Sequence, residues 1–216
     1  MVIKMDKSLG LDKSELDAIK EVGNMGVGNA ATALSKMLNK KVEIRLNDTK
    51  FIPIEDFANE MGGAERIVVT SYMQITSDMK GEALFLFSRE SALQMVDLVM
   101  ERDVGTTKII DSMEESAFKE MSNIFTGSYL NSMSKMFEMK LIHSVPHIAV
   151  DMTQAVIDFV LIRLATKAEK VLTIHTTIDI EDHDINGIFI ILFEESSLKK
   201  MVDILHNKYG IGFNES

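Results

Sequence analysis

The chain contains no cysteine and no tryptophan, and it has only two prolines in 216 residues. The lack of cysteine excludes disulfides, thiolate metal sites and cysteine nucleophiles. No apolar run reaches the roughly 18 to 20 residues of a membrane-spanning helix, and the N-terminus lacks the pattern of a signal peptide. We therefore expect a cytoplasmic protein that does not insert into a membrane.

Basic side chains are scarce as well, with 23 Lys and Arg against 33 Asp and Glu and a formal net charge of −10. A surface that binds nucleic acid has to neutralise phosphates with basic residues, so this balance argues against a nucleic-acid partner. Hydrophobic residues make up 46% and charged residues 26%, which is typical of a globular protein with a sizeable core.

The sequence consists of two similar halves. A shift of 99 residues aligns identical residues in two segments of about 24 residues, without a gap. The identical pairs are Ala18 and Ala117, Lys20 and Lys119, Glu21 and Glu120, Asn24 and Asn123, Gly28 and Gly127, and the Ser-Lys-Met runs at 35–37 and 134–136. Internal duplication explains this pattern. We predict one domain over 1–216, built from pseudo-symmetric halves at about 13–103 and 111–209.

Each half has the pattern of a long helix, several strands and a second helix. The helices are expected at 13–39, with Asp12 as a possible N-cap, and at 90–102, 111–138 and 194–209. The strands are expected at 41–46, 65–75, 81–88, 140–144, 154–166, 170–180 and 186–193, where Ile, Val, Leu and Phe are frequent. This order predicts an α/β (α+β) fold in which two repeated helix–strands–helix halves surround a mainly antiparallel sheet.

The two long helices carry the same polar stripe. At about 100° per residue, an arc of about 60° holds Asp17, Glu21, Asn24 and Gly28 in the first helix, and Ser116, Glu120, Asn123 and Gly127 in the second. The opposite face of each helix is apolar and must pack inward, so the stripes should face outward. Exposed Glu and Asn are usually only solvated surface, but their repetition makes both stripes candidate sites.

Three glycines interrupt the first long helix, and each should cost about 1 kcal/mol relative to alanine. Gly26 lies on the inward face, where it would allow close helix–sheet packing. Gly28, like Gly127, would let another molecule approach the helix, whereas Gly23 suggests no role. A phosphate-binding loop is the alternative interpretation. The glycine spacing, however, matches neither GxxxxGK(S/T) nor GxGxxG, and a helical pattern, not a strand, precedes the glycines.

Metal binding is a second alternative. The residues at 181–184, with the sequence EDHD, combine acidic side chains with a histidine. A polar turn before a strand explains them better, and the five histidines are otherwise dispersed. We therefore expect no metal site in this chain.

The stripes resemble the signature of the CheC/CheX/FliY family of chemotaxis phosphatases. That signature is Asp or Ser, three residues, Glu, two residues, Asn, then 22 residues and Pro. The second half matches it fully with Ser116, Glu120, Asn123 and Pro146, whereas the first half matches with Asp17, Glu21 and Asn24 but has Asn47 in place of the proline. Because proline shapes the backbone and supplies no reactive group, this departure concerns a turn more than the chemistry.

The resemblance implies hydrolysis of the aspartyl phosphate of the response regulator CheY. Asn24 and Asn123 would hold the attacking water, and Glu21 and Glu120 would pair with a lysine of CheY. Asp17 and Ser116 would tune docking, and Gly28 and Gly127 would permit close approach. The chain would need no cofactor of its own, because CheY supplies Mg²⁺ at the phosphoryl group.

The resemblance also implies a second partner, the receptor deamidase CheD, and with it the alternative that the chain is mainly a non-enzymatic adaptor. The helix expected at 194–209 would be a candidate docking surface. Its Leu198, Met201, Val202 and Leu205 follow helical spacing, which packing into the core explains better than docking.

Overall fold

The computed structural model describes residues 13–53, 63–164, 170–181 and 183–209, together with residues 56 and 59. The first half contains α1 (Lys13–Leu38), β1 (Val42–Pro53), β2 (Ile67–Ser77), β3 (Gly81–Ser88) and α3 (Arg89–Val99). The second half contains α4 (Ser112–Phe137), β4 (Leu141–His143), β5 (His147–Met152), α5 (Thr153–Leu164), β6 (Lys170–Ile180), β7 (His183–Phe193) and α6 (Glu195–Tyr209). Asp12, the expected N-cap, lies outside the described residues.

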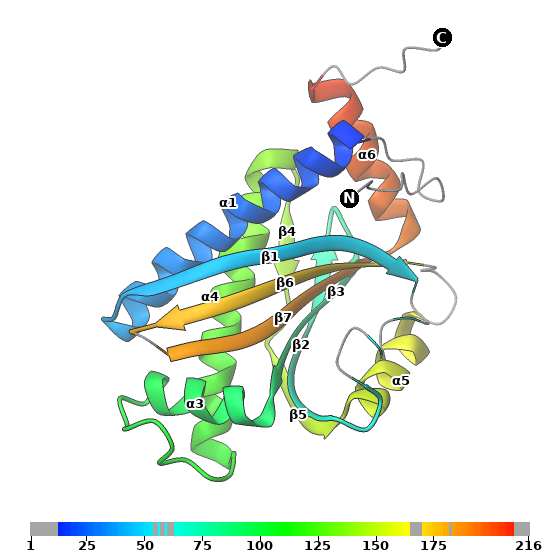
Figure 1. Ribbon diagram of the computed structural model, residues 1–216. Coiled ribbons are helices and arrows are strands. Elements are labelled where there is room, and N and C mark those ends of the chain that lie inside the picture. The colour runs from blue at the N-terminus through cyan, green and yellow to red at the C-terminus, as the bar shows by residue number, and fades with distance from the viewer. Residues whose placement is uncertain are drawn as a thin grey trace.

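Both halves contribute strands to one curved seven-stranded sheet (Figure 1). The order is β1-β6-β7-β3-β2-β4, with β5 also paired to β2, and the pairings are antiparallel. β3 and β7 are neighbours in the middle of the sheet. Outside β7 lie β6 and then β1, and outside β3 lie β2 and then β4 and β5. At the two edges, β1 corresponds to β4 and β5 taken together, 99 residues later. The predicted antiparallel sheet and its repeated halves are therefore confirmed.

The helices cover the two faces of the sheet unequally. The main hydrophobic core contains residues of α1, α3, α4 and α6 together with one face of the sheet. A smaller cluster joins Val156 and Ile157 of α5 to the opposite face through Val68, Leu84 and Ile190. Because α1 and α4 form the layer on one side (Figure 1), their outer surfaces remain available for binding.

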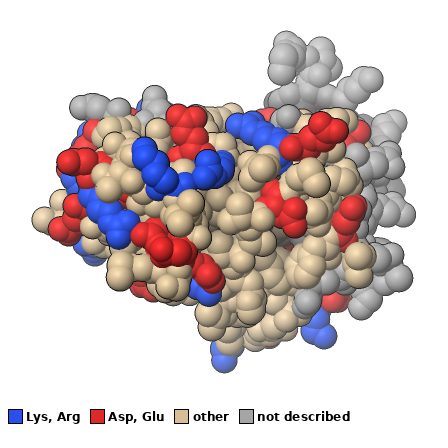
Figure 2. Space-filling model, turned by 90° about the horizontal axis from the view of Figure 1, so that it is seen from below, with Lys and Arg blue, Asp and Glu red and all other residues tan. Residues whose placement is uncertain are grey.

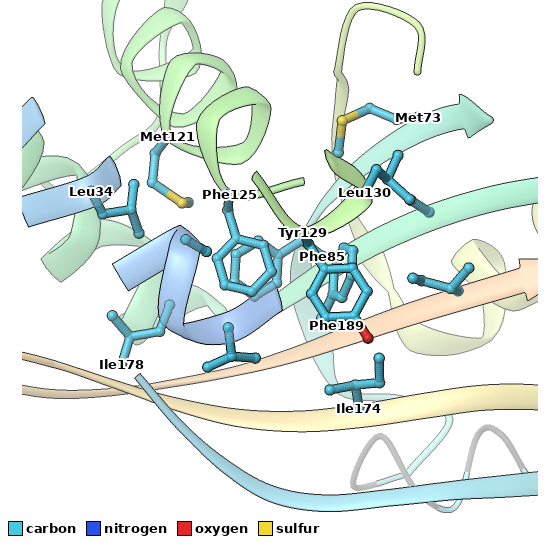
Figure 3. Close-up of a cluster of buried hydrophobic side chains, with 14 of the residues drawn as sticks. Leu34, Met73, Phe85, Met121, Phe125, Tyr129, Leu130, Ile174, Ile178 and Phe189 are labelled. Carbon is cyan, nitrogen blue, oxygen red and sulfur yellow. The ribbon is translucent and has the colours of Figure 1, made fainter. Parts of the chain in front are cut away.

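Aromatic rings fill the space between the long helices and the middle of the sheet (Figure 3). Phe125 lies 4.4 Å from Phe85 and 5.0 Å from Phe189, and Tyr129 lies 5.0 Å from Phe189, measured between ring centroids. Full burial of one such side chain stabilises the fold by about 1.5–3 kcal/mol. The cluster holds α4 on β3 and β7 and so fixes the helix that carries the second stripe.

The strand predicted at 154–166 is wrong, since Thr153–Leu164 form the helix α5. Val156 and Ile157 are buried while Asp158 is exposed, and Gln154 Nε2 donates to Asp158 Oδ1 one turn later at 2.8 Å. A short apolar run has no periodicity that separates a strand from a helix. The strand expected at 140–144 is the short β4, and β5, which follows it, was not anticipated.

A buried carboxylate secures the connection between the halves. Asp97 of α3 is fully buried, and its two oxygens accept hydrogen bonds from the backbone N–H groups of Gly105 and Thr107 at 2.8 and 2.9 Å. Burial by itself raises the pKa of Asp97, but the hydrogen bonds from Thr107 and Gly105 outweigh it and the pKa is lowered.

Replacing Asp97 with alanine should destabilise the fold by about 3 kcal/mol, because the backbone N–H groups of Gly105 and Thr107 lose a charged acceptor. Since folding lowers the pKa of Asp97, its contribution is complete above the ordinary value of 3.8 and is lost as the pH falls through the lowered value. Urea unfolding should show a constant difference from the parent down to about pH 5 and a smaller one below about pH 4. Asp103→Ala, at an exposed position of the same connection, should match the parent at every pH.

Candidate functional site

The first stripe lies on the outer surface of α1. Asp17, Glu21, Asn24 and Gly28 are all exposed, as predicted from the helical periodicity. The helix turns this side outward because Val22, Gly26 and Ala30 on its other side are buried. Among the described contacts, Asn24 makes no side-chain hydrogen bond within the chain, so its carboxamide is available to a partner.

The second stripe occupies the equivalent surface of α4. Ser116 and Glu120 are exposed, whereas Asn123 and Gly127 are half-buried. The hydroxyl of Ser116 donates to the carbonyl of Ser112 at 2.8 Å, one turn earlier in the same helix. The two stripes therefore share their residues but differ in how open they are.

Gly26 packs against α4 and not against the sheet, which corrects our expectation. A Cβ atom added at Gly26 would lie only 2.6 Å from Cδ2 of Tyr129. Next to this contact, Asn29 Nδ2 of α1 donates to Ser132 Oγ of α4 at 2.8 Å. Gly23 faces the same tyrosine, with Leu46 also nearby. The two stripe-bearing helices are thus held directly against each other.

The position of the signature proline interrupts a strand in both halves. Pro146 is buried and lies in the gap between β4 and β5. Asn47, its counterpart, lies at the bulge between Leu46 and Asp48, where the register of β1 against β6 shifts. Its Nδ2 donates to Thr177 Oγ1 at 2.7 Å. Without the proline, β1 continues through a β-bulge, whereas the second half is divided at Pro146 into the separate strands β4 and β5.

The stripes lie on the outward surfaces of two helices. A cavity of about 470 Å³ is lined instead by residues of β2, β3, β5 and α5, among them Tyr72, Leu84 and Phe159. Within the described ranges, no group of three His, Asp or Glu residues is placed to hold a metal ion. Carboxylates and carboxamides on such a surface can form hydrogen bonds with a partner or with a water molecule.

Two further observations concern the surface. Lys, Arg, Asp and Glu are interspersed on the face of the molecule shown in Figure 2, so no single sign dominates there. None of the helices in the described parts of the chain has the length and apolar character needed to cross a bilayer.

A curved antiparallel sheet with a repeated helix on one face defines the fold class of the protein. The crystal structure of FliY from Thermotoga maritima has this fold, with a TM-score of 0.75 and 20% sequence identity over 92% of this chain and 99% of that chain. At this level of identity, the similarity concerns the fold alone.

Family comparison then relates the stripes to known proteins. The model of the CheC-like family matches residues 15–45 and 113–149, which contain both stripes. The chain is 29% identical to the CheY-P phosphatase CheC of Bacillus subtilis over 176 residues, which are 81% of this chain and 84% of that protein. It is also 31% identical to the flagellar motor switch phosphatase FliY of B. subtilis over 139 residues, but these cover only 36% of FliY. In the segments that carry both stripes, the chain is therefore similar to the CheC-like family.

Proposed function

We propose that the chain is a cytoplasmic phosphatase that hydrolyses the aspartyl phosphate of the chemotaxis response regulator CheY. One observation carries the proposal: an outward-facing Glu and Asn, three residues apart, occur on both α1 and α4. Two relatives are named as phosphatases, and one of them as a CheY-P phosphatase. Similarity to the CheC-like family and the repeated pair together favour this activity over a merely solvated surface.

Asn24 and Asn123 would each position the attacking water. A carboxamide has both donors and an acceptor, so it can orient a water molecule in line with the phosphoryl group. An aspartyl phosphate is a mixed anhydride and is already activated, so the proposal needs no strong general base. Mg²⁺ on CheY would neutralise the developing charge.

Glu21 and Glu120 would anchor the partner instead of reacting with it. A carboxylate aimed at a phosphoryl group would be repelled, whereas one that accepts a hydrogen bond from a lysine would fix the docking register. Each Glu precedes its Asn by three residues and therefore lies beside it on the helix surface. Docking and water positioning would be coupled by this spacing.

Replacing both Glu21 and Glu120 with glutamine should raise KM for phosphorylated CheY about 10-fold to 100-fold, because each site loses a charge-assisted hydrogen bond worth roughly 1.5–3 kcal/mol. The value of kcat should change far less, since the water-positioning amides remain. Steady-state phosphate release at several CheY concentrations measures both constants. Glu43→Gln, an exposed change on β1, is the matched control. A fall in kcat at constant KM would contradict the anchoring role.

The adaptor alternative assigned a docking surface to α6. Met201 and Leu205 of that helix are fully buried in the main core, so packing accounts for them. The side chains of Leu198 and Val202 lie outside the described ones. Binding to CheD stays a separate proposal without support from α6. A pull-down with purified CheD tests it independently of the phosphatase assay.

A further inference from the structure

The two stripes differ in what lies beside their glycine. A Cβ added at Gly28 would meet no atom within 4 Å, whereas one added at Gly127 would lie 3.2 Å from Nε2 of His143. Asn24 is exposed and Asn123 is half-buried, consistent with a neighbour on the second stripe only. Gly127 therefore makes room for an imidazole of this chain, and this modifies our expectation that it simply leaves space for a partner.

Sheet register explains why His143 reaches α4. His143 of β4 is paired with Ile75 of β2, and Ile75 is buried in the core beneath the helices. Directly opposed residues of an antiparallel pair point to the same face of the sheet. The imidazole is therefore on the helix side, where it meets Gly127. Its counterpart in the first half is Ile44, which is partly buried against the core.

Hydrogen bonding defines the chemistry of the ring. Nδ1 of His143 lies 2.9 Å from the carbonyl oxygen of Ser144, and a carbonyl can only accept, so Nδ1 carries the hydrogen. In the neutral imidazole, Nε2 is then an acceptor. Gln74 holds Ser144 through two hydrogen bonds, at 2.9 and 3.0 Å. The structure gives Nε2 no hydrogen-bond partner among the described residues.

We propose that His143 is a docking residue of the second site, whose Nε2 accepts a hydrogen bond from the partner beside Asn123. The inference rests on the proposed function, because it assumes that the partner is phosphorylated CheY. Gly127 follows Asn123 by four residues, a rise of about 6 Å along the helix, so a partner that reaches the amide also reaches the imidazole. The two sites then hold the same partner by different contacts, and His143 determines the specificity of the second one.

The test uses a chain in which Asn24→Ala silences the first site. In this chain His143→Ile introduces the residue of the first half, and KM for phosphorylated CheY should rise threefold to tenfold, the effect of one hydrogen bond, with kcat nearly unchanged. His143→Gln keeps a polar amide near the position of Nε2 and should restore most of the affinity. His143→Asn keeps only the bond to Ser144 and should behave like His143→Ile.

The outcomes distinguish a docking role of His143 Nε2 from a structural role of Nδ1 in holding Ser144. An unchanged KM in His143→Ile, or rescue by asparagine and not by glutamine, would overturn the docking role. The proposed function fails in a different way, since the Asn24→Ala chain and the parent would then both lack activity. His183→Ala, exposed on β7, should behave like the Asn24→Ala parent, and thermal unfolding verifies that each variant is folded.

Discussion

Replacing both Asn24 and Asn123 with alanine should abolish dephosphorylation of CheY while the protein stays folded. Loss of the groups that position the water should lower the rate of phosphate release at least about 100-fold, to that of CheY alone. Asn24 is exposed, Asn123 is half-buried, and neither makes a side-chain hydrogen bond among the described contacts, so the free energy of unfolding should change by less than about 1 kcal/mol. Release of phosphate from phosphorylated CheY measures the loss, and urea unfolding measures the stability.

Asn131→Ala provides the matched control, because Asn131 is an exposed asparagine of α4 that lies eight residues, about 12 Å along the helix, beyond Asn123. The two single variants then show how activity is divided between the sites. Full activity in the double variant would eliminate the mechanism, and a variant that is both inactive and unfolded would indicate a structural effect instead.

Gly26→Ala should destabilise the protein by about 2 kcal/mol. The new methyl group would lie 2.6, 2.8 and 3.1 Å from three atoms of the Tyr129 ring. That ring is 2% exposed and packs on Phe189, so it cannot move aside. Overpacking of a core typically costs about 1–3 kcal/mol, and the roughly 1 kcal/mol gained in helix propensity offsets only part of a large loss. The melting temperature should fall by about 4–8 °C.

Gly28→Ala, two residues further along the same helix, should have the opposite effect on stability. No atom lies within 4 Å of its new methyl group, so the gain in helix propensity of about 1 kcal/mol should remain. The two variants therefore distinguish the effect of side-chain packing on stability from the effect of helix propensity, within one helix. Equal melting temperatures for the two variants would show that α1 can shift away from Tyr129, and our account of Gly26 would be wrong.

Much of the fold was predictable because its signals are local and occur twice. The long helices at 13–39 and 111–138 are α1 and α4 to within a residue at each end, since apolar residues recur at helical spacing over seven turns. The same periodicity placed Glu21, Asn24 and Glu120 on the outer surface, where the structure has them exposed. The repeat at 99 residues also anticipated two similar halves, and the sheet follows this repeat.

Other features depended on contacts between residues that are far apart in the chain. The run at 154–166 is a helix because it folds back over the sheet, where Val156 and Ile157 complete a second cluster. Gly26 meets Tyr129, and Gly127 meets His143, only because α1, α4 and β4 are brought together. The 99-residue offset pairs Ile44 with His143 and so indicates that the two halves differ there. The sequence does not indicate that His143 lies against Gly127 of the second stripe.

Periodicity along the chain thus determined which side of each helix faces out, since the burial of apolar side chains requires it. The tertiary structure alone decided which atoms stand beside each stripe, because that depends on the register of the strands and on the packing of one helix against another.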